Sequence, residues 1–408
     1  MNILGVIIGF AIIIILNYKR INLGYAILIG AVIGGMITGI NFFEILNILI
    51  KTLQEYTTIR LAVIMILISG LGFILDKNND FNNLVNSLFK IFNSNKPLIV
   101  LFPSIIATLS VPGGAILSAP MVDKSGDNID LSLVNKTASN LFYRHIFFLV
   151  YPLYPSLIVT ADLFDVSEFY IIKYNIIIMS VGLLVSYFLF FYNKEKSTTA
   201  KNNKKNIDLS NELKNVLLSL GSIIIILVLS LIFNIEFMLS LFIGTLWSFF
   251  RYFNKEGYSD KIIYQYITKG VNYKLVIIII SVMFFKNIIE ISGLPNMIGD
   301  ILNEATFSLI VVIPVLGFVT SFFLGSNMGS LGILAPIFIP IFPANNAGPY
   351  ITLLFISAYI GYNLSPIHLC LVLTKEYFNT GYIEIYNRLI MPFSLMLLTA
   401  IFQFLYLN

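Results

Sequence analysis

Two adjacent side chains inside an apolar stretch, Arg144 and His145, could bind an anion or carry a proton. If the apolar segment 137–160 is helical, Arg144 lies roughly 13 Å deep in it, because a helix rises about 1.5 Å per residue. A charge at such depth in a membrane is costly and usually functional. A guanidinium can hold a carboxylate through two parallel hydrogen bonds. The alternatives for Arg144 are a structural bond to a carbonyl or a side chain that extends to the membrane interface.

His145 could relay a proton or bond a substrate, because imidazole titrates near neutral pH. It could equally be a neutral histidine bonded to the backbone of its own helix. His368, just past Pro366, has the same two interpretations. Polar residues near helix breakers complete the set, although small polar residues also join membrane helices. The candidate substrate ligands are Asn140, Arg144, His145, Asn327, Ser330, Asn363 and His368. The candidate ion ligands are Ser110, Gly113, Gly114, Ser326, Asn327 and Gly329.

The coupling ion is expected to be sodium or a proton. No Asp or Glu stands clearly in the middle of an apolar segment, which favours sodium held by neutral oxygens. His145 keeps proton coupling open. Two histidines and the single Cys370 offer little for zinc. We therefore expect no cofactor and no metal other than Na⁺.

The composition indicates a membrane protein. Of the 408 residues, 58% are hydrophobic and 11% are charged, and the mean hydropathy is +0.89. A soluble protein has about a quarter of its residues charged. The net charge of +4 gives no reason to expect nucleic acid as a partner; the lipid bilayer is the expected surrounding. Lys19 and Arg20 follow the first apolar run, whereas a signal peptide carries its positive charge before that run. We predict a retained first span with its N-terminus outside.

Segments of about 20 apolar residues are long enough to cross the hydrocarbon as helices. The predicted spans are 3–17, 22–42, 59–76, 137–160, 168–192, 212–233, 236–252, 272–290, 350–372 and 389–407. Segments 43–57 and 79–92 are amphipathic, which is typical of interfacial helices.

Two further apolar regions, 97–122 and 307–342, contain clusters of helix breakers. If 97–122 is a hairpin that returns to its own side, most of the 25 Lys and Arg residues share one face with the basic linker 193–211. If it crosses instead, that linker lies outside and the acidic loop 161–168 lies inside. The positive-inside rule favours the hairpin. Both regions are predicted to be re-entrant hairpins, with the linker cytoplasmic and both chain termini outside.

The chain contains an internal repeat. Arg60 precedes Lys274 by the same distance along the sequence as Asp76 precedes Glu290 and Gly30 precedes Gly244. At nearly the same spacing, Ser110 matches Ser326, Gly113 matches Gly329, Ala119-Pro120 matches Ala335-Pro336, and Pro155 matches Pro366.

These matches predict an all-α polytopic membrane protein built from two inverted repeats, 1–192 and 212–408, joined by the linker. Each repeat would have about five transmembrane helices, one hairpin (97–122 or 307–342) and one broken helix (137–160 or 350–372). Inverted repeats with broken helices at the midplane are the architecture of secondary transporters. Unwound carbonyls there can hold a cation, and helix N-termini favour an anion.

The segment SVPGGAILSAPMVD, residues 110–123, is followed by NLFYRHIFFLVYPLYP, and a second hairpin also ends in Ala-Pro. This pattern resembles the ion-transporter superfamily of citrate, dicarboxylate, gluconate and arsenite permeases, and more closely an uncharacterised prokaryotic branch of it. The resemblance implies an elevator-type transporter, often a homodimer, with 43–57 and 257–269 as scaffold helices. In sodium–dicarboxylate members the hairpin tips carry Ser-Asn-Thr. Here one tip keeps Ser326 and Asn327 and the other keeps Ser110 alone.

The function expected from the sequence is secondary transport of a small organic anion, a carboxylate, coupled to Na⁺ or H⁺. The abundance of Ile, Asn and Lys suggests a prokaryotic cytoplasmic (inner) membrane. A passive channel or facilitator is one alternative, although a channel rarely needs inverted broken helices. An intramembrane hydrolase is another, but the usual Gly-x-Ser-Gly spacing is absent and a duplication has no purpose in a single catalytic site. No phosphate-binding Gly-Lys-Ser/Thr loop is present. We therefore do not expect an enzyme.

Overall fold

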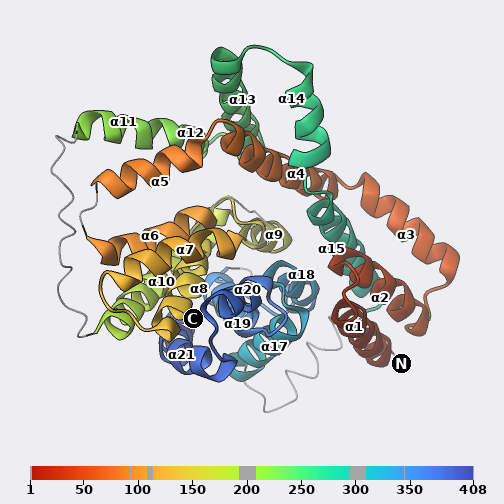
Figure 1. Ribbon diagram of the computed structural model, residues 1–408. Helices are drawn as coiled ribbons and strands as arrows, with labels where there is room; N and C mark the ends of the chain where they lie inside the picture. The colour runs from red at the N-terminus through yellow and green to blue at the C-terminus, as the bar shows by residue number, and fades with distance from the viewer. Residues whose placement is uncertain are drawn as a thin grey trace.

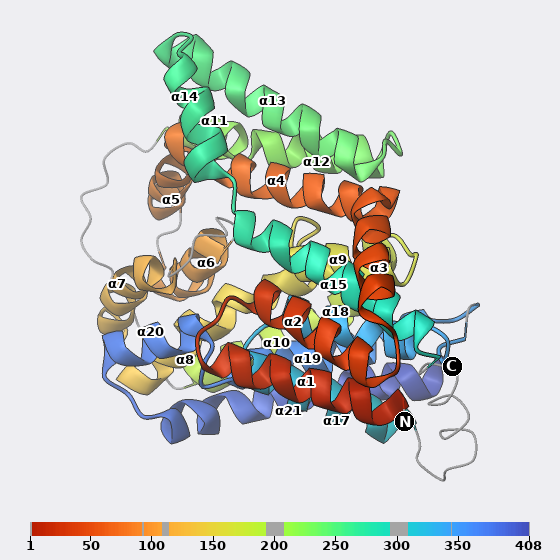
Figure 2. The ribbon, with the colours of Figure 1, turned by 90° about the vertical axis from the view of Figure 1, so that its right-hand side faces the viewer.

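The computed structural model describes residues 2–91, 94–107, 114–192, 208–293, 309–343 and 345–407. Every regular element within these ranges is a helix (Figures 1 and 2), which confirms the all-α prediction. Four of the described segments are long and apolar enough to cross a membrane, and a bent pair of helices would make a fifth. The four are Tyr56–Lys77, Glu168–Phe191, Gly348–Phe378 and Tyr382–Tyr406.

The elements of the first half follow the predicted apolar segments. They are α1 (Asn2–Tyr18), α2 (Leu23–Ile37), α3 (Phe42–Gln54), α4 (Tyr56–Lys77), α5 (Asp80–Ile91), α6 (Asn95–Ala107), α7 (Gly114–Asp127), α8 (Leu133–Ile146), the 3₁₀ helix η1 (Phe147–Leu149), α9 (Pro155–Leu163) and α10 (Glu168–Phe191). The tip between α6 and α7, where Ser110 and Gly113 fall, lies outside the described residues.

The second half begins after residues 193–207, which also lie outside the described ranges. Its elements are α11 (Leu209–Ser219), α12 (Gly221–Leu231), α13 (Phe237–Glu256), α14 (Asp260–Gln265), the π-helix η2 (Tyr266–Gly270), α15 (Tyr273–Ile291), α17 (Leu309–Leu324), α18 (Asn327–Phe338), α19 (Gly348–Leu364), α20 (Leu369–Phe378) and α21 (Tyr382–Tyr406).

The first two helices are shorter than a typical span and pack closely together through glycines. A Cβ added to Gly9 would lie 2.7 Å from the Gly30 carbonyl oxygen, and one added to Gly34 would lie 3.0 Å from the Gly5 oxygen. Small residues let membrane helices approach this closely. Larger side chains at these positions would push α1 away from α2.

Two hydrophobic cores divide the molecule. One, around Phe142, Phe355 and Phe393, is built from α6–α10 and α17–α21, which we call the bundle. The other, around Ile64 and Phe284, is built from α1–α4 and α12–α15, which we call the frame. In Figure 1 the frame extends from the top to the right-hand side, and the bundle lies below it to the left.

Helices α9, α17 and α18 each contribute residues to both cores, and α9 and α18 do so along their length. On α9, Leu157 packs into the bundle core and Ile158 into the frame core. On α18, Leu331 packs into the bundle core and Ile333 into the frame core. Helices α9 and α18 also pack against each other. They form the seam through which the bundle contacts the frame.

The predicted single span 212–233 is not straight, because α11 and α12 meet at a bend of 63°. The first part of this segment is polar, and α11 turns away to pack against α5. Lys90 on α5 bonds Glu212 at 2.7 Å and thereby lowers the pKa of that carboxyl. Arg251 on α13 donates to the Leu218 carbonyl at 2.7 Å. Polar contacts therefore hold α11 against α5 and α13.

Candidate functional site

Three predicted residues from two distant parts of the sequence meet inside the bundle. Arg144 and His145 lie in the last turn of α8, and His368 lies between α19 and α20. Their exposed fractions are 4%, 1% and 3%. The centroids of the two imidazole rings are 4.8 Å apart, and the Tyr362 ring lies 3.9 Å from that of His368.

Prolines place these residues beside breaks in the helices. Tyr154 and Ser365 precede Pro155 and Pro366, and both adopt extended backbone angles, with ψ of 119° and 127°. A proline disfavours helical geometry in the residue before it. Consequently the chain between η1 and α9 is not helical, and neither is the chain between α19 and α20. These breaks fall within the segments 137–160 and 350–372, where interrupted spans were predicted.

Arg144 is a buried cation without a counter-ion among the described residues. Its Nε and Nη1 atoms have no hydrogen-bond partner there, and it belongs to none of the ion pairs found there. An unpaired buried charge costs several kcal/mol. A bound anion would remove that cost. Of the groups in the site, this guanidinium therefore has the strongest need for a ligand.

The two histidines differ in their hydrogen bonding. The Nδ1 atom of His145 lies 2.7 Å from the Leu141 carbonyl oxygen, so it carries the proton and leaves the Nε2 lone pair free. Both ring nitrogens of His368 are buried without a partner among the described residues. The pair could therefore share a proton or bind a polar substrate group.

The same histidines and Cys370 form a set of soft metal donors. One ligand atom from each side chain lies within 4.8 Å of the others. Nitrogen and sulfur ligands suit zinc or copper. However, Arg144 lies close enough to act electrostatically on both imidazoles, and its positive charge opposes a cation there. We therefore assign no metal to this cluster.

The tip of the second hairpin lies between the two helix breaks. Gly325, with φ of +58°, makes the turn, and a Cβ there would come 2.7 Å from Ile367 in the second break. Asn327, 2% exposed, lies beside the Tyr154 hydroxyl in the first break, although neither atom of its amide completes a hydrogen bond. Ser330 is fully buried and its hydroxyl is also without a partner among the described residues. The N-terminus of α18 lies in this region, and a helix N-terminus favours negative charge.

Several other predicted ligands make structural bonds in this arrangement. Asn140 donates to the Ala115 carbonyl at 3.1 Å and to Thr374 Oγ1 at 3.2 Å, which ties α8 to α7 and α20. Asn363 donates to the Tyr359 carbonyl at 2.9 Å.

The predicted ion ligands near the hairpins also have structural roles. Ser326 Oγ caps α18 by accepting from the Gly329 amide at 3.1 Å. A Cβ on Gly329 would lie 2.6 Å from Leu23 on α2, so this glycine allows the hairpin to approach the frame. Gly114 is the first residue of α7. An ion-binding role for these residues stays a prediction.

Sequence reasoning missed part of the site. Tyr154 stacks on Phe148 with a centroid separation of 4.2 Å, and Phe148 packs edge-on against His145. Cys370 joins the histidines. The position of Tyr154 directly before a break-inducing proline was the available signal, but tyrosine is common in this chain.

Comparison with other proteins gives two findings. Residues 3–407 match a protein family described as "protein of unknown function (DUF401)". Among solved structures, the fold is similar to the crystal structure of the YdaH transporter of Alcanivorax borkumensis, described as having an unusual topology. The TM-score is 0.57 at 14% identity, over 88% of this chain and 87% of that one. No curated protein matches.

At that identity the structural likeness concerns the fold alone. The family match, in contrast, extends over almost the whole sequence. The chain is therefore a member of the DUF401 family.

Proposed function

We propose that this protein is a secondary active transporter of a small organic anion, with a carboxylate as the substrate class. The observation that carries the proposal is Arg144, a buried guanidinium with two nitrogen atoms that have no partner among the described residues. A carboxylate could accept two hydrogen bonds from it. The similar fold of a protein named as a transporter supports transport over hydrolysis.

The surroundings of Arg144 suit an anion with further polar groups. Asn327 and Ser330 are buried with unused hydrogen-bonding capacity, and they stand in the first turn of α18. A helix N-terminus adds favourable potential for negative charge. In this proposal Arg144 holds the carboxylate while the α18 tip and the His145–His368 pair contact the rest of the molecule.

The division into bundle and frame supports an elevator mechanism, in which the bundle carries the site past the frame. The proposed inverted repeats have support from corresponding helix contacts. α6 packs on α8 as α17 packs on α19, and α7 packs on α20 as α18 packs on α9. We further propose that both chain termini lie outside and that the protein resides in a prokaryotic inner membrane. We also propose that it forms a homodimer and belongs to the ion-transporter superfamily.

Two couplings fit this site. The adjacent imidazoles of His145 and His368 could take up one proton with the substrate. Sodium would need neutral oxygens, yet Ser326 uses its hydroxyl to cap α18 and its carbonyl to accept from Ser330. Each of these oxygens keeps a second lone pair, so sodium binding by Ser326 would add a ligand to a capped helix end.

The proposal is tested by thermal unfolding of the purified protein with a panel of carboxylates, in sodium or choline, at two pH values. A ligand that binds only the folded state raises the unfolding midpoint. We expect one carboxylate to raise it for the wild type and for the exposed control Arg388→Ala, but not for Arg144→Ala or Arg144→Lys. If no anion shifts the midpoint under any condition, the anion proposal is wrong.

A passive channel is the remaining alternative that this test addresses. Proteoliposomes preloaded with unlabelled anion should accumulate labelled anion transiently if a carrier exchanges the two. A channel shows no such counterflow.

A further inference from the structure

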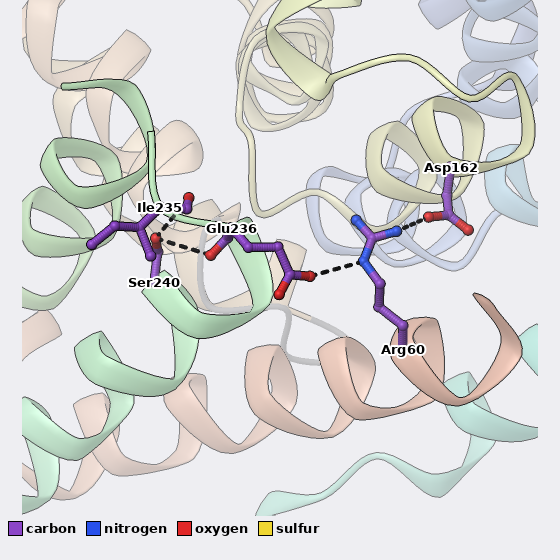
Figure 3. A network of polar contacts seen from close by, with 5 residues as sticks. All are labelled: Arg60, Asp162, Ile235, Glu236 and Ser240. Carbon is purple, nitrogen blue, oxygen red and sulfur yellow. Dashed lines mark hydrogen bonds and ion pairs between the residues drawn. The ribbon is translucent and has the colours of Figure 1, made fainter. Parts of the chain in front are cut away.

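The frame holds the bundle through an ion-pair network on one side of the molecule. Arg60 on α4 contacts Asp162 on α9, and its Nε lies 3.1 Å from Glu236 Oε1, immediately before α13 (Figure 3). The exposed fractions of the Arg60 and Asp162 side chains are 22% and 6%. Arg60 and Glu236 belong to the frame, whereas Asp162 lies on a seam helix. This network therefore spans the boundary between the two bodies.

The internal repeat contains a corresponding pair of residues. Asp162 precedes Glu376 by the same distance along the sequence as Arg60 precedes Lys274. Asp162 and Glu376 also occupy the same place counted from the start of α9 and α20. Lys274 stands in the first turn of α15, as Arg60 stands near the start of α4. The second half of the chain thus carries its own basic and acidic partners.

The side chains of this second pair do not form an ion pair, and we call such a pair open. Lys274 and Glu376 are both exposed, and neither joins any ion pair found in the described part of the chain. In Figure 2 the start of α15 and helix α20 lie toward the left-hand side, and the α3–α4 corner lies at the right. The closed and open pairs therefore lie toward opposite ends of the helices.

Helix packing shows the same asymmetry. On the side of the closed pair, α9 packs against α4 and α18 packs against α15. Within the described residues, the corresponding pairs, α20 with α15 and α7 with α4, make no contact of comparable extent to that of α18 with α15. Apolar side chains that would fill such an interface are instead uncovered: Ile116 and Leu117 on α7 are 45% and 54% exposed, and Leu369 on α20 is 50% exposed.

We propose that Arg60–Asp162 and Lys274–Glu376 are two alternating latches of the transport cycle, a proposal that rests on the alternating movement in the proposed function. In the arrangement seen here the first latch is closed and the second is open. When the bundle moves along the frame, Asp162 leaves Arg60 and Glu376 reaches Lys274. Each arrangement is then held by one ion pair between a basic residue of the frame and a carboxylate of the bundle or seam.

Two features make the first latch releasable. Glu236 remains beside Arg60 within the frame, so the guanidinium keeps a counter-ion when Asp162 departs. A cavity of about 570 Å³ adjoins the pair and is lined by Arg60, Asp162, Asp165 and Glu168. Polar walls of this kind admit water, which can solvate the separating charges.

The test measures proximity and needs no substrate. In a Cys370→Ser background, which removes the single native cysteine, cysteines are introduced as Lys274→Cys with Glu376→Cys. Membrane vesicles are treated with a bifunctional thiol reagent as long as the two original side chains, and the cross-linked fraction is measured by mass spectrometry. The matched control is Lys286→Cys with Glu290→Cys, an ion pair of 3.6 Å within α15 that spans no boundary.

We expect Asp162→Asn to raise the cross-linked fraction of the 274–376 pair about fivefold, the effect of about 1 kcal/mol lost from an ion pair. The control pair should not change. Exchange of the two charges, Arg60→Asp with Asp162→Arg, should return the fraction to its original value. If Asp162→Asn does not elute as a single species, Arg60→Gln releases the same latch.

An unchanged 274–376 fraction after release of the first latch overturns the proposal. Its failure is distinguishable from failure of the proposed function. Anion-dependent stabilisation through Arg144 can persist without latches, and cross-linking can respond to Asp162→Asn even if no carboxylate binds.

Discussion

Arg60 and Arg144 both lie between packed helices, but one guanidinium is paired with carboxylates and the other is not. Arg60 contacts two carboxylates, Asp162 and Glu236, which come from different helices. Arg144 is more deeply buried and has two nitrogen atoms without a partner among the described residues. A buried charge that is paired within the protein fixes one element to another. A buried charge that lacks such a pair is retained at a cost, which points to a ligand.

The largest loss of stability is expected where a buried cation loses both of its carboxylate partners. The Lys136 side chain is 3% exposed and bonds Asp123 and Asp127. Asp123→Asn with Asp127→Asn should lower the free energy of unfolding by about 3 kcal/mol, because the ammonium is left buried and unpaired. Thermal unfolding measures this loss. Adding Lys136→Met should recover most of it, and a failure to recover would show that the ion pairs are not its cause.

A smaller loss is expected at the paired arginine. Asp162→Asn with Glu236→Gln leaves Arg60 without its two partners, and Arg60 is less buried than Lys136. We expect a loss of about 2 kcal/mol in the same measurement. Arg60→Met in addition should restore stability. If the two carboxylate changes alone have no effect, Arg60 is held by something other than charge.

Replacement of the unpaired Arg144 should not lower the free energy of unfolding. Without added anion, Arg144→Met should leave the unfolding midpoint unchanged or raise stability by about 1 kcal/mol, because it removes a desolvated charge and keeps the volume. The same variant should lose stabilisation by carboxylates. A clear loss of stability without ligand would mean that Arg144 has a structural partner, and the contrast with Arg60 would disappear.

The smallest change in stability is expected at an exposed ion pair, which serves as a reference for the other variants. Lys286 and Glu290 lie 3.6 Å apart within α15, with the carboxylate half exposed. Glu290→Gln should change stability by less than about 0.5 kcal/mol, because exposed ion pairs contribute little. A larger change, measured by thermal unfolding, would indicate that this pair is less hydrated than its exposed fraction suggests.

Much of the helical framework was predictable from local sequence. The prolines at 155 and 366 interrupt their helices one residue downstream of Tyr154 and Ser365, as proline sterics require. Gly325 and Ser326 end one hairpin arm and begin the next. The bend between α11 and α12 was not predictable, since it depends on the contact of α11 with α5 from another part of the chain.

The candidate site was predictable only in part. Arg144, His145, His368 and Asn327 stand out as polar residues in apolar segments, and the structure places them around the two breaks. Asn140 also stood out; its amide nitrogen joins α8 to α7 and α20, whereas its Oδ1 atom has no partner among the described residues. A sequence shows that a polar group is buried, but the group's partner is set by whichever helix packs beside it.

The sequence by itself determined the helical content and many of the places where helices end. These depend on apolar periodicity and on glycine and proline sterics, which act over a few residues. Only the tertiary structure decided that His145 meets His368, that Arg60 is paired across the seam and that Lys274 and Glu376 are apart. Those contacts join segments separated by a hundred residues or more, and the packing of two bodies selects one arrangement among those that the same local pattern allows.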